Sequence, residues 1–285
     1  MWIKILGLSL VGLAAAFGLA RLYGASRWQA GTEALRTRLA AARSAVAPNA
    51  FDPRELEGLP FPVQRFFLAA LRPGQPMIAA AHLCHAGTFN MGETRPSWKP
   101  FTSTEVVTIR RPGFDWDGRI GMAPGLPVRV HDAYVAGEGI LEARLLGLFK
   151  LVDLHGTADL AEGELLRYLA EAMWYPTALL PSQGVRWEPI DESSARATFA
   201  DGGTAVSLDF HFAADGLIES TRAIARPRTL GGTVVASPWG GRGWRYELRD
   251  GMRIPVAGEV AWFTPEGAYP YWRGEITSLR FEFAR

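Results

Sequence analysis

Hydrophobic and polar positions follow a different pattern in three successive parts of the chain. Residues 5–20 carry no charge and are apolar on every side. Residues 27–46 place apolar side chains three, four or seven positions apart, which predicts an amphipathic helix. Beyond residue 78, apolar and polar residues alternate with a period of two, which predicts β-strands. We therefore expect helices first and a sheet afterwards.

The uncharged segment has nearly the length of a membrane span. With residues 1–4 it makes twenty residues that contain a single lysine, and about 20 residues cross a bilayer core. Trp2 and Tyr23 suit the headgroup zones of a retained anchor, whereas Gly18-Leu19-Ala20 resembles a signal cleavage site. A buried core helix is the third interpretation, and the all-round apolar surface disfavours it. We predict a membrane anchor or signal over residues 1–23, in a single-pass membrane protein.

Two signals disagree on which side of the membrane the rest of the chain lies. Lys4 and the amino terminus stand against Arg21, Arg27, Arg36 and Arg38, and the positive-inside rule then places the large domain in the cytoplasm. The short charged N-terminal region followed by an apolar stretch instead resembles an export signal. We expect an extracytoplasmic domain.

Residues 24–76 predict a helical stalk followed by short helices. The stalk is either a connector that packs on the domain or a surface helix that binds a partner, and we expect the connector, ending near Pro48. Asp52 before Pro53 predicts the start of a short helix. A second helix is expected over residues 62–71. The apolar stripe of the stalk consists of Trp28, Leu35, Leu39, Ala42 and Val46.

Residues 77–285 predict one antiparallel β domain. We count about ten strands with one buried and one wet face, separated by Asp-Gly turns. An inserted helix is predicted at 161–173, with Glu162 and Glu164 in its first turn. The predicted fold class is α+β, mainly antiparallel β: a large curved, half-barrel-like sheet with a few helices on one side. Two smaller β domains joined near residues 181–184 are the alternative.

Composition and charge exclude several classes of protein. The 285 residues are 48% hydrophobic and 21% charged, which excludes a disordered chain. A net charge of +1 offers no basic face, so we expect no nucleic-acid partner. The single cysteine, Cys84, is expected to be buried and structural. His82 and His85 are expected to point to opposite faces of a strand, so no metal site is predicted. No nucleotide motif occurs, so no cofactor is predicted, and residues 237–243 are interpreted as a glycine-rich turn rather than an anion site.

Histidines and carboxylates support an alternative, catalytic hypothesis. A hydrolase or isomerase acting on an apolar substrate needs a histidine within hydrogen-bond reach of a carboxylate, both open to one pocket. Asp115 and Asp117 are interpreted as a solvated pair, and Arg167 with Glu171 as an i,i+4 pair on the polar side of the inserted helix, so neither predicts a site. The residues that could supply such chemistry are His82, His131, Asp132, His155, Glu171 and Arg273.

Aromatic residues favour a binding function instead. The 15 Phe, 10 Trp and 7 Tyr either fill the core of a curved sheet or line an apolar pocket. The apolar segment 176–181, stiffened by two prolines, is expected to pack into the core or to form a pocket rim. We predict a membrane-anchored envelope protein that binds a lipid-like or other apolar small molecule between sheet and helices. The residues predicted to contact it are Trp98, Phe101, Tyr168, Trp174, Leu179, Leu180 and Trp272.

Several stretches together resemble one family. They are 59–66 (LPFPVQRF), 98–101 (WKPF), 163–171 (GELLRYLAE), 174–181 (WYPTALLP), 253–260 (RIPVAGEV) and 270–274 (PYWRG). Over about residues 55–285 the chain is similar to an uncharacterised bacterial family, a domain of unknown function in membrane-anchored proteins. That family supplies no catalytic residues. More loosely, such a sheet with helices on one side resembles the half-barrel of lipoprotein-carrier proteins, a likeness of fold that does not establish function.

Overall fold

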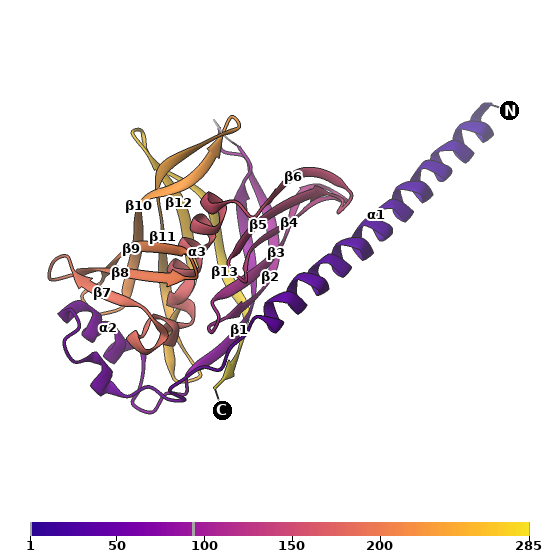
Figure 1. Ribbon diagram of the computed structural model, residues 1–285. Helices are drawn as coiled ribbons and strands as arrows, with labels where there is room; N and C mark the ends of the chain where they lie inside the picture. The colour runs from indigo at the N-terminus through magenta and orange to yellow at the C-terminus, as the bar shows by residue number, and fades with distance from the viewer. Residues whose placement is uncertain (1, 93–94, 285) are drawn as a thin grey trace.

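A long helix and a curved sheet make up the protein. The computed structural model describes residues 2–92 and 95–284, so Met1 of the predicted anchor lies outside the described residues. Within them, helix α1 (Trp2–Ala41) extends away from a 13-stranded antiparallel sheet that curves around a second helix, α3 (Ala158–Glu171) (Figure 1). The predicted fold class is confirmed, and one continuous sheet replaces the alternative of two smaller β domains.

The path of the chain explains why a helix lies inside the curve of the sheet. Strands β1–β6 run from the middle of the sheet to one edge, the chain crosses through α3 to the other edge, and β7–β13 return until β13 pairs with β1. Helix α3 therefore contacts β3–β5 in one half of the sheet and β9–β11 in the other. The strands are β1 (Ile78–Asn90), β2 (Trp98–Thr108), β3 (Gly113–Ala123), β4 (Leu126–Val135), β5 (Glu138–Leu145), β6 (Phe149–His155), β7 (Arg186–Pro189), β8 (Ser194–Asp201), β9 (Thr204–Phe212), β10 (Ile218–Leu230), β11 (Thr233–Arg249), β12 (Met252–Thr264) and β13 (Gly267–Phe283).

The structure has more strands than the sequence predicts. Thirteen strands are present among the described residues instead of about ten. The segment 237–243 is not a turn but the middle of β11. Its glycines are needed inside the strand, because a Cβ at Gly240 would collide with the carbonyl oxygen of Thr221 on β10. The glycines mark a close approach of two strands. From the sequence pattern alone, the same glycines are interpreted as a turn.

The short helices follow their capping signals. The Asp52 side chain accepts a hydrogen bond from the Arg54 amide, which starts the 3-10 helix η1. Helix α3 begins before the predicted residue 161, because the Thr157 side chain caps it by accepting a hydrogen bond from the Leu160 amide. Glu164 therefore lies beyond the first turn and is buried. The remaining helices are η1 (Pro53–Leu56), α2 (Phe61–Ala70), η2 (Ala172–Trp174), η3 (Pro176–Leu179) and η4 (Pro181–Gln183).

The second half of α1 packs on the sheet face opposite α3. The helix runs without a break from the apolar segment and ends at Ala41, before the predicted Pro48. Trp28, Leu35 and Leu39 are buried against β2–β4, so the stalk is a packed connector as expected. Its apolar stripe therefore fixes α1 to the domain, while the first half of the helix projects away from it (Figure 1).

Polar contacts beneath α1 correct the prediction for Asp115 and Asp117. These carboxylates face the helix rather than solvent, and Asp115 is fully buried. Arg36 Nε donates to Asp115 at 2.7 Å, and His131 Nδ1 lies 2.7 Å from the same carboxylate. Trp28 Nε1 donates to Asp117 at 2.8 Å. An alternating pattern identifies the polar face of a strand but not the helix that covers it.

Two glycines of α1 provide a matched test of this docking. Gly24 is buried, and a Cβ there would collide with the Leu146 carbonyl, whereas Gly31 has nothing within 4 Å of that position. Gly31→Ala should stabilise the protein by up to about 1 kcal/mol through helix propensity. Gly24→Ala should instead destabilise it by about 1–3 kcal/mol, because the docked helix must shift. Denaturant unfolding of the full chain in detergent measures both, and equal effects of the two substitutions would contradict the docking.

Candidate functional site

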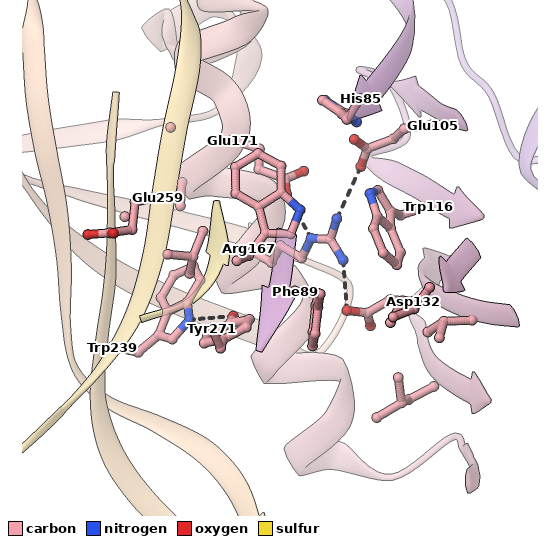
Figure 2. Close-up of a pocket in the computed structure, with 18 of the residues that line it drawn as sticks. His85, Phe89, Glu105, Trp116, Asp132, Arg167, Glu171, Trp239, Glu259 and Tyr271 are labelled. Atoms are coloured by element: carbon pink, nitrogen blue, oxygen red, sulfur yellow. Dashed lines mark hydrogen bonds and ion pairs between the residues drawn. The ribbon is translucent and has the colours of Figure 1, made fainter. Parts of the chain in front are cut away.

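A cavity of about 300 Å³ lies between α3 and the concave face of the sheet (Figure 2). This volume is at the lower end of the roughly 300–1,000 Å³ typical of small-molecule sites. Both halves of the sheet contribute to its walls, from β1–β6 on one side and β10–β13 on the other, and α3 with η2 closes it. The site therefore exists only because the chain crosses the sheet as a helix.

Aromatic rings form much of the wall. Trp174 from η2 and Trp272 from β13 contact each other with ring centroids 6.1 Å apart. Trp239 donates its Nε1 hydrogen to the Tyr271 hydroxyl at 2.9 Å, so neither polar group needs a ligand (Figure 2). Trp116 adds a further ring from β3. These large rings make the wall mainly apolar, and the Trp239–Tyr271 hydrogen bond fixes two of them in place.

A buried arginine lies at the side of the cavity. Arg167 of α3 donates to Asp132 on β4 and to Glu171 one helical turn away, both at 2.7 Å, and lies 3.6 Å from Glu105 on β2 (Figure 2). Its guanidinium also stacks over Trp116 at 5.4 Å. The predicted i,i+4 pair of Arg167 with Glu171 is therefore present, but the polar side of the helix on which it lies is largely buried, with both side chains 13% exposed. The residues surrounding α3 come from strands distant in sequence, so the helix pattern alone does not reveal this burial.

The pKa values of two buried glutamates beside α3, Glu105 and Glu164, are raised, and this reduces the negative charge around the helix. Burial first, and the nearby Glu171 second, hold the pKa of Glu105 well above its usual range. Burial and Asp132 do the same to the pKa of Glu164, whose partner Arg226 donates to it at 3.1 Å. Burial opposes the charge of Arg167, but the surrounding carboxylates outweigh it and raise the Arg167 pKa. Protonated Glu105 and Glu164 leave two arginines facing two carboxylates, so the cluster is close to neutral.

Two ring nitrogens in the cavity wall are without partners. Within the described part of the chain, neither Trp174 Nε1 nor His85 Nε2 makes a hydrogen bond, although both side chains are more than nine-tenths buried. The two rings touch, with centroids 5.1 Å apart. Burial first, and Arg167 second, lower the pKa of His85 to about 3, so the imidazole is neutral. This corner of the cavity can hold one polar atom of a ligand, such as a carbonyl oxygen accepting from Trp174.

The residues of the catalytic hypothesis do not meet in one place. Asp132 and Glu171 line the cavity, but both are bound to Arg167. His131 lies beneath α1 on the opposite sheet face, and His82 pairs with Glu282 near the end of that helix. The other two candidates do not line the cavity: exposed His155 binds Asp153, and Arg273 binds Glu259, which is itself a cavity residue. Among the described residues, no histidine and carboxylate that contact each other open on the cavity.

His85 and Glu105 are among the cavity residues that the sequence analysis missed. His85 lies on the inner face of β1, whereas Cys84 beside it is half-buried rather than fully buried as expected. Glu105 is one acidic residue on a strand, with no signal in the sequence that α3 covers it. The described residues include no group of three histidine, cysteine or acidic side chains placed to hold a metal ion.

The residues predicted to contact a ligand occupy different layers. Trp174 and Trp272 line the cavity. Phe101 lies behind them, 5.7 Å from the Trp272 ring, and Trp98 stands on the other face under the Arg273 guanidinium. The remaining three are core residues outside the cavity wall: Tyr168, Leu179 and Leu180. A ligand-binding role for each of the seven stays a prediction.

Replacing Glu105 tests the charge balance. A raised folded-state pKa means that deprotonating Glu105 costs stability, a cost absent below the unfolded pKa of about 4 and growing as pH rises above it. Glu105→Gln should therefore raise the stability of the protein at pH ~8, by about 1–3 kcal/mol, and leave it unchanged at pH ~4. Glu171→Gln, which removes a direct ion pair with Arg167, should destabilise at pH ~8. Thermal unfolding at both pH values measures this, and a destabilising Glu105→Gln at pH ~8 would show that Glu105 is ionised in the fold.

Several solved structures are similar to this chain at low sequence identity. Among solved structures, a domain described as an outer membrane lipoprotein-sorting protein from Vibrio parahaemolyticus is 8% identical, with a TM-score of 0.39, over 72% of this chain and 86% of that one. A LolA superfamily protein from Nitrosomonas europaea is 10% identical, with a TM-score of 0.39, over 78% and 94%. A DUF1329 family protein from Desulfovibrio piger is 12% identical, with a TM-score of 0.36, over 72% and 86%.

Similarity at this level says nothing about what this chain binds. No curated protein matches the chain. Residues 57–281 match a family of unknown function, DUF6920, and this confirms the resemblance to an uncharacterised family. Since the match covers most of the sequence, the protein is a member of the DUF6920 family.

Proposed function

We propose that the protein is a membrane-anchored envelope protein that holds a lipid-like or other apolar molecule in the cavity beneath α3. The observation that carries this proposal is the cavity itself: aromatic and aliphatic walls, with its one buried charge cluster internally balanced. An apolar ligand there gains about 0.8 kcal/mol for each methylene removed from water.

The polar groups of the cavity limit the kind of ligand. Arg167 already binds the carboxylates of Asp132 and Glu171, so it has no unbalanced charge to offer an anion. Glu171 and Asp132 are held by the same arginine, and Glu259, which also lines the cavity, is held by Arg242 and Arg273. These carboxylates are therefore not free to bind a cation. The unpartnered Trp174 Nε1 favours a ligand with a hydrogen-bond acceptor, such as the carbonyl of an ester, within an otherwise apolar body.

The first half of α1 supports membrane anchoring. Leu6–Ala41 includes a segment long and apolar enough to cross a bilayer, and that segment is not buried by the rest of the protein. Leu10, Phe17 and Leu22 are among its large exposed side chains. A helix apolar on all sides is stable in a bilayer and costly in water. Because the charged N-terminal region and apolar stretch resemble an export signal, we place the domain on the extracytoplasmic side.

A pair of tryptophans separates ligand binding from core packing. Trp174 lines the cavity, whereas Trp187 packs against Phe210 and donates to the Leu179 carbonyl, outside the cavity wall. Trp174→Ala should weaken binding of dansyl-undecanoic acid by about tenfold, a loss of about 1.4 kcal/mol. Trp187→Ala should lower stability by about 3–5 kcal/mol without changing the Kd. Fluorescence titration and thermal unfolding of the full chain measure both. If Trp174→Ala lowered thermal stability as much as it lowered affinity for the probe, Trp174 would be an ordinary core residue.

Filling the cavity gives the complementary test. Ala143 of β5 is a small buried residue that lines the cavity. Ala143→Phe should place a ring in the ligand's space and abolish binding of dansyl-undecanoic acid, with the melting temperature retained. A variant that stays folded and binds with the wild-type Kd would show that the probe binds elsewhere.

A further inference from the structure

The helix that anchors the protein also sets how far the domain stands from the bilayer. The uncharged segment ends at Ala20, and the first buried residue after it is Gly24, four residues later. At 1.5 Å per residue, this is about 6 Å of continuous helix. Arg21 and Tyr23 between them are exposed and suit the headgroup zone. The sheet therefore begins directly at the level where α1 leaves the bilayer.

Two turns of the sheet lie beside this part of α1. Gly125, in the turn between β3 and β4, lies against Phe17 and Arg21. Leu146 and Gly147, in the turn between β5 and β6, lie against Gly24. Figure 1 shows the β5–β6 end of the sheet turned towards the projecting half of α1. This end of the sheet is therefore the end nearest the bilayer.

Strand β6 is the free edge of the sheet at that end, and four of its seven residues are apolar. It pairs with β5 alone, and its register shifts between Lys150 and Val152, which leaves Leu151 as the extra residue of a bulge. Phe149 is 61% exposed and Leu151 54% exposed. An exposed apolar edge strand is a liability in water, where it promotes aggregation. Against a bilayer the same surface is favourable.

The same strand forms the side wall of the cavity. Leu151 and Val152 line the cavity, and Phe149 pairs with Leu145 on the sheet face to which Val152 and its partner Ala143 belong. An exposed side chain that also lines the cavity marks a place where the cavity communicates with the outside. At β6 this opening lies beside the point where α1 leaves the bilayer.

We propose that the β6 edge rests on the membrane surface and that an apolar ligand passes there directly between the bilayer and the cavity. This inference depends on the proposed function and names its partner, which is the lipid surface itself. The rigid junction at Gly24 holds the opening in place, so the ligand's apolar part does not have to cross water. The residues at the opening are then positioning residues for transfer rather than determinants of affinity.

Spin labels test the placement of the edge. Phe149→Cys and Leu248→Cys, each in a Cys84→Ser background, put nitroxides at exposed sites at opposite ends of the sheet; Leu248 is 71% exposed beside the β11–β12 turn. The full chain is reconstituted into vesicles of phosphatidylethanolamine and phosphatidylglycerol. The label at 149 should relax more with lipid-soluble oxygen than with a water-soluble nickel chelate, and the label at 248 should do the reverse. Dominant relaxation by the nickel chelate at both sites would overturn the placement.

Transfer kinetics test the route. Phe149 and Leu154 are exposed on β6 and lie outside the cavity wall, and the double variant Phe149→Ser, Leu154→Ser should slow the loss of dansyl-undecanoic acid from the full chain to added vesicles by at least about tenfold, which is 1.4 kcal/mol in the barrier. Its equilibrium Kd should stay within about twofold of wild type, and Leu248→Ser should change neither quantity. If the wild type does not bind the probe, the proposed function fails and the route with it. If it binds and the double variant releases at the wild-type rate, only the route is wrong.

Discussion

Two polar contacts made by charged arginines, on opposite sides of α3, hold the two halves of the sheet around one space. Arg167 reaches Asp132 on β4, and Glu164 receives a hydrogen bond from Arg226 on β10, so a single helix is tied to strands on either side of the central β1–β13 pair. An open sheet of this width must curl or be covered to bury its apolar face. The helix covers the face without filling it, and the space left is the cavity.

Burying these charged groups costs free energy of desolvation, so the contacts have a role other than raising stability. A buried ion pair is seldom more stable than apolar residues of the same volume, because desolvation offsets the attraction. The raised pKa values of Glu105 and Glu164 reduce that cost by keeping protons where charge would be in excess. What the polar contacts add is a fixed position for α3. A helix held only by apolar contacts could settle deeper and close the cavity.

The sequence predicts the helices and strands of this fold better than it predicts which of their residues another element buries. Period-two patterns and capping residues such as Asp52 identify strands and helix starts, because these depend on neighbours along the chain. The burial of Asp115 and Arg167 depends on which distant element lies over them, and the pattern assigns both to solvent. The same distinction applies to the residues that line the cavity. Trp174 and Trp272 are found from the aromatic pattern, whereas His85 and Glu105 become cavity residues only when β1 and β2 meet α3.

The central claim is that the space beneath α3 is occupied by an apolar molecule. Native mass spectrometry of the full chain, released from detergent micelles after purification from a membrane extract, tests it most directly. The account predicts a bound species of one defined mass or a homologous series differing by methylene units, and organic extraction of the same sample should recover it. Protein that carries no such species, and takes up none when lipid extract is added before release, would contradict the account.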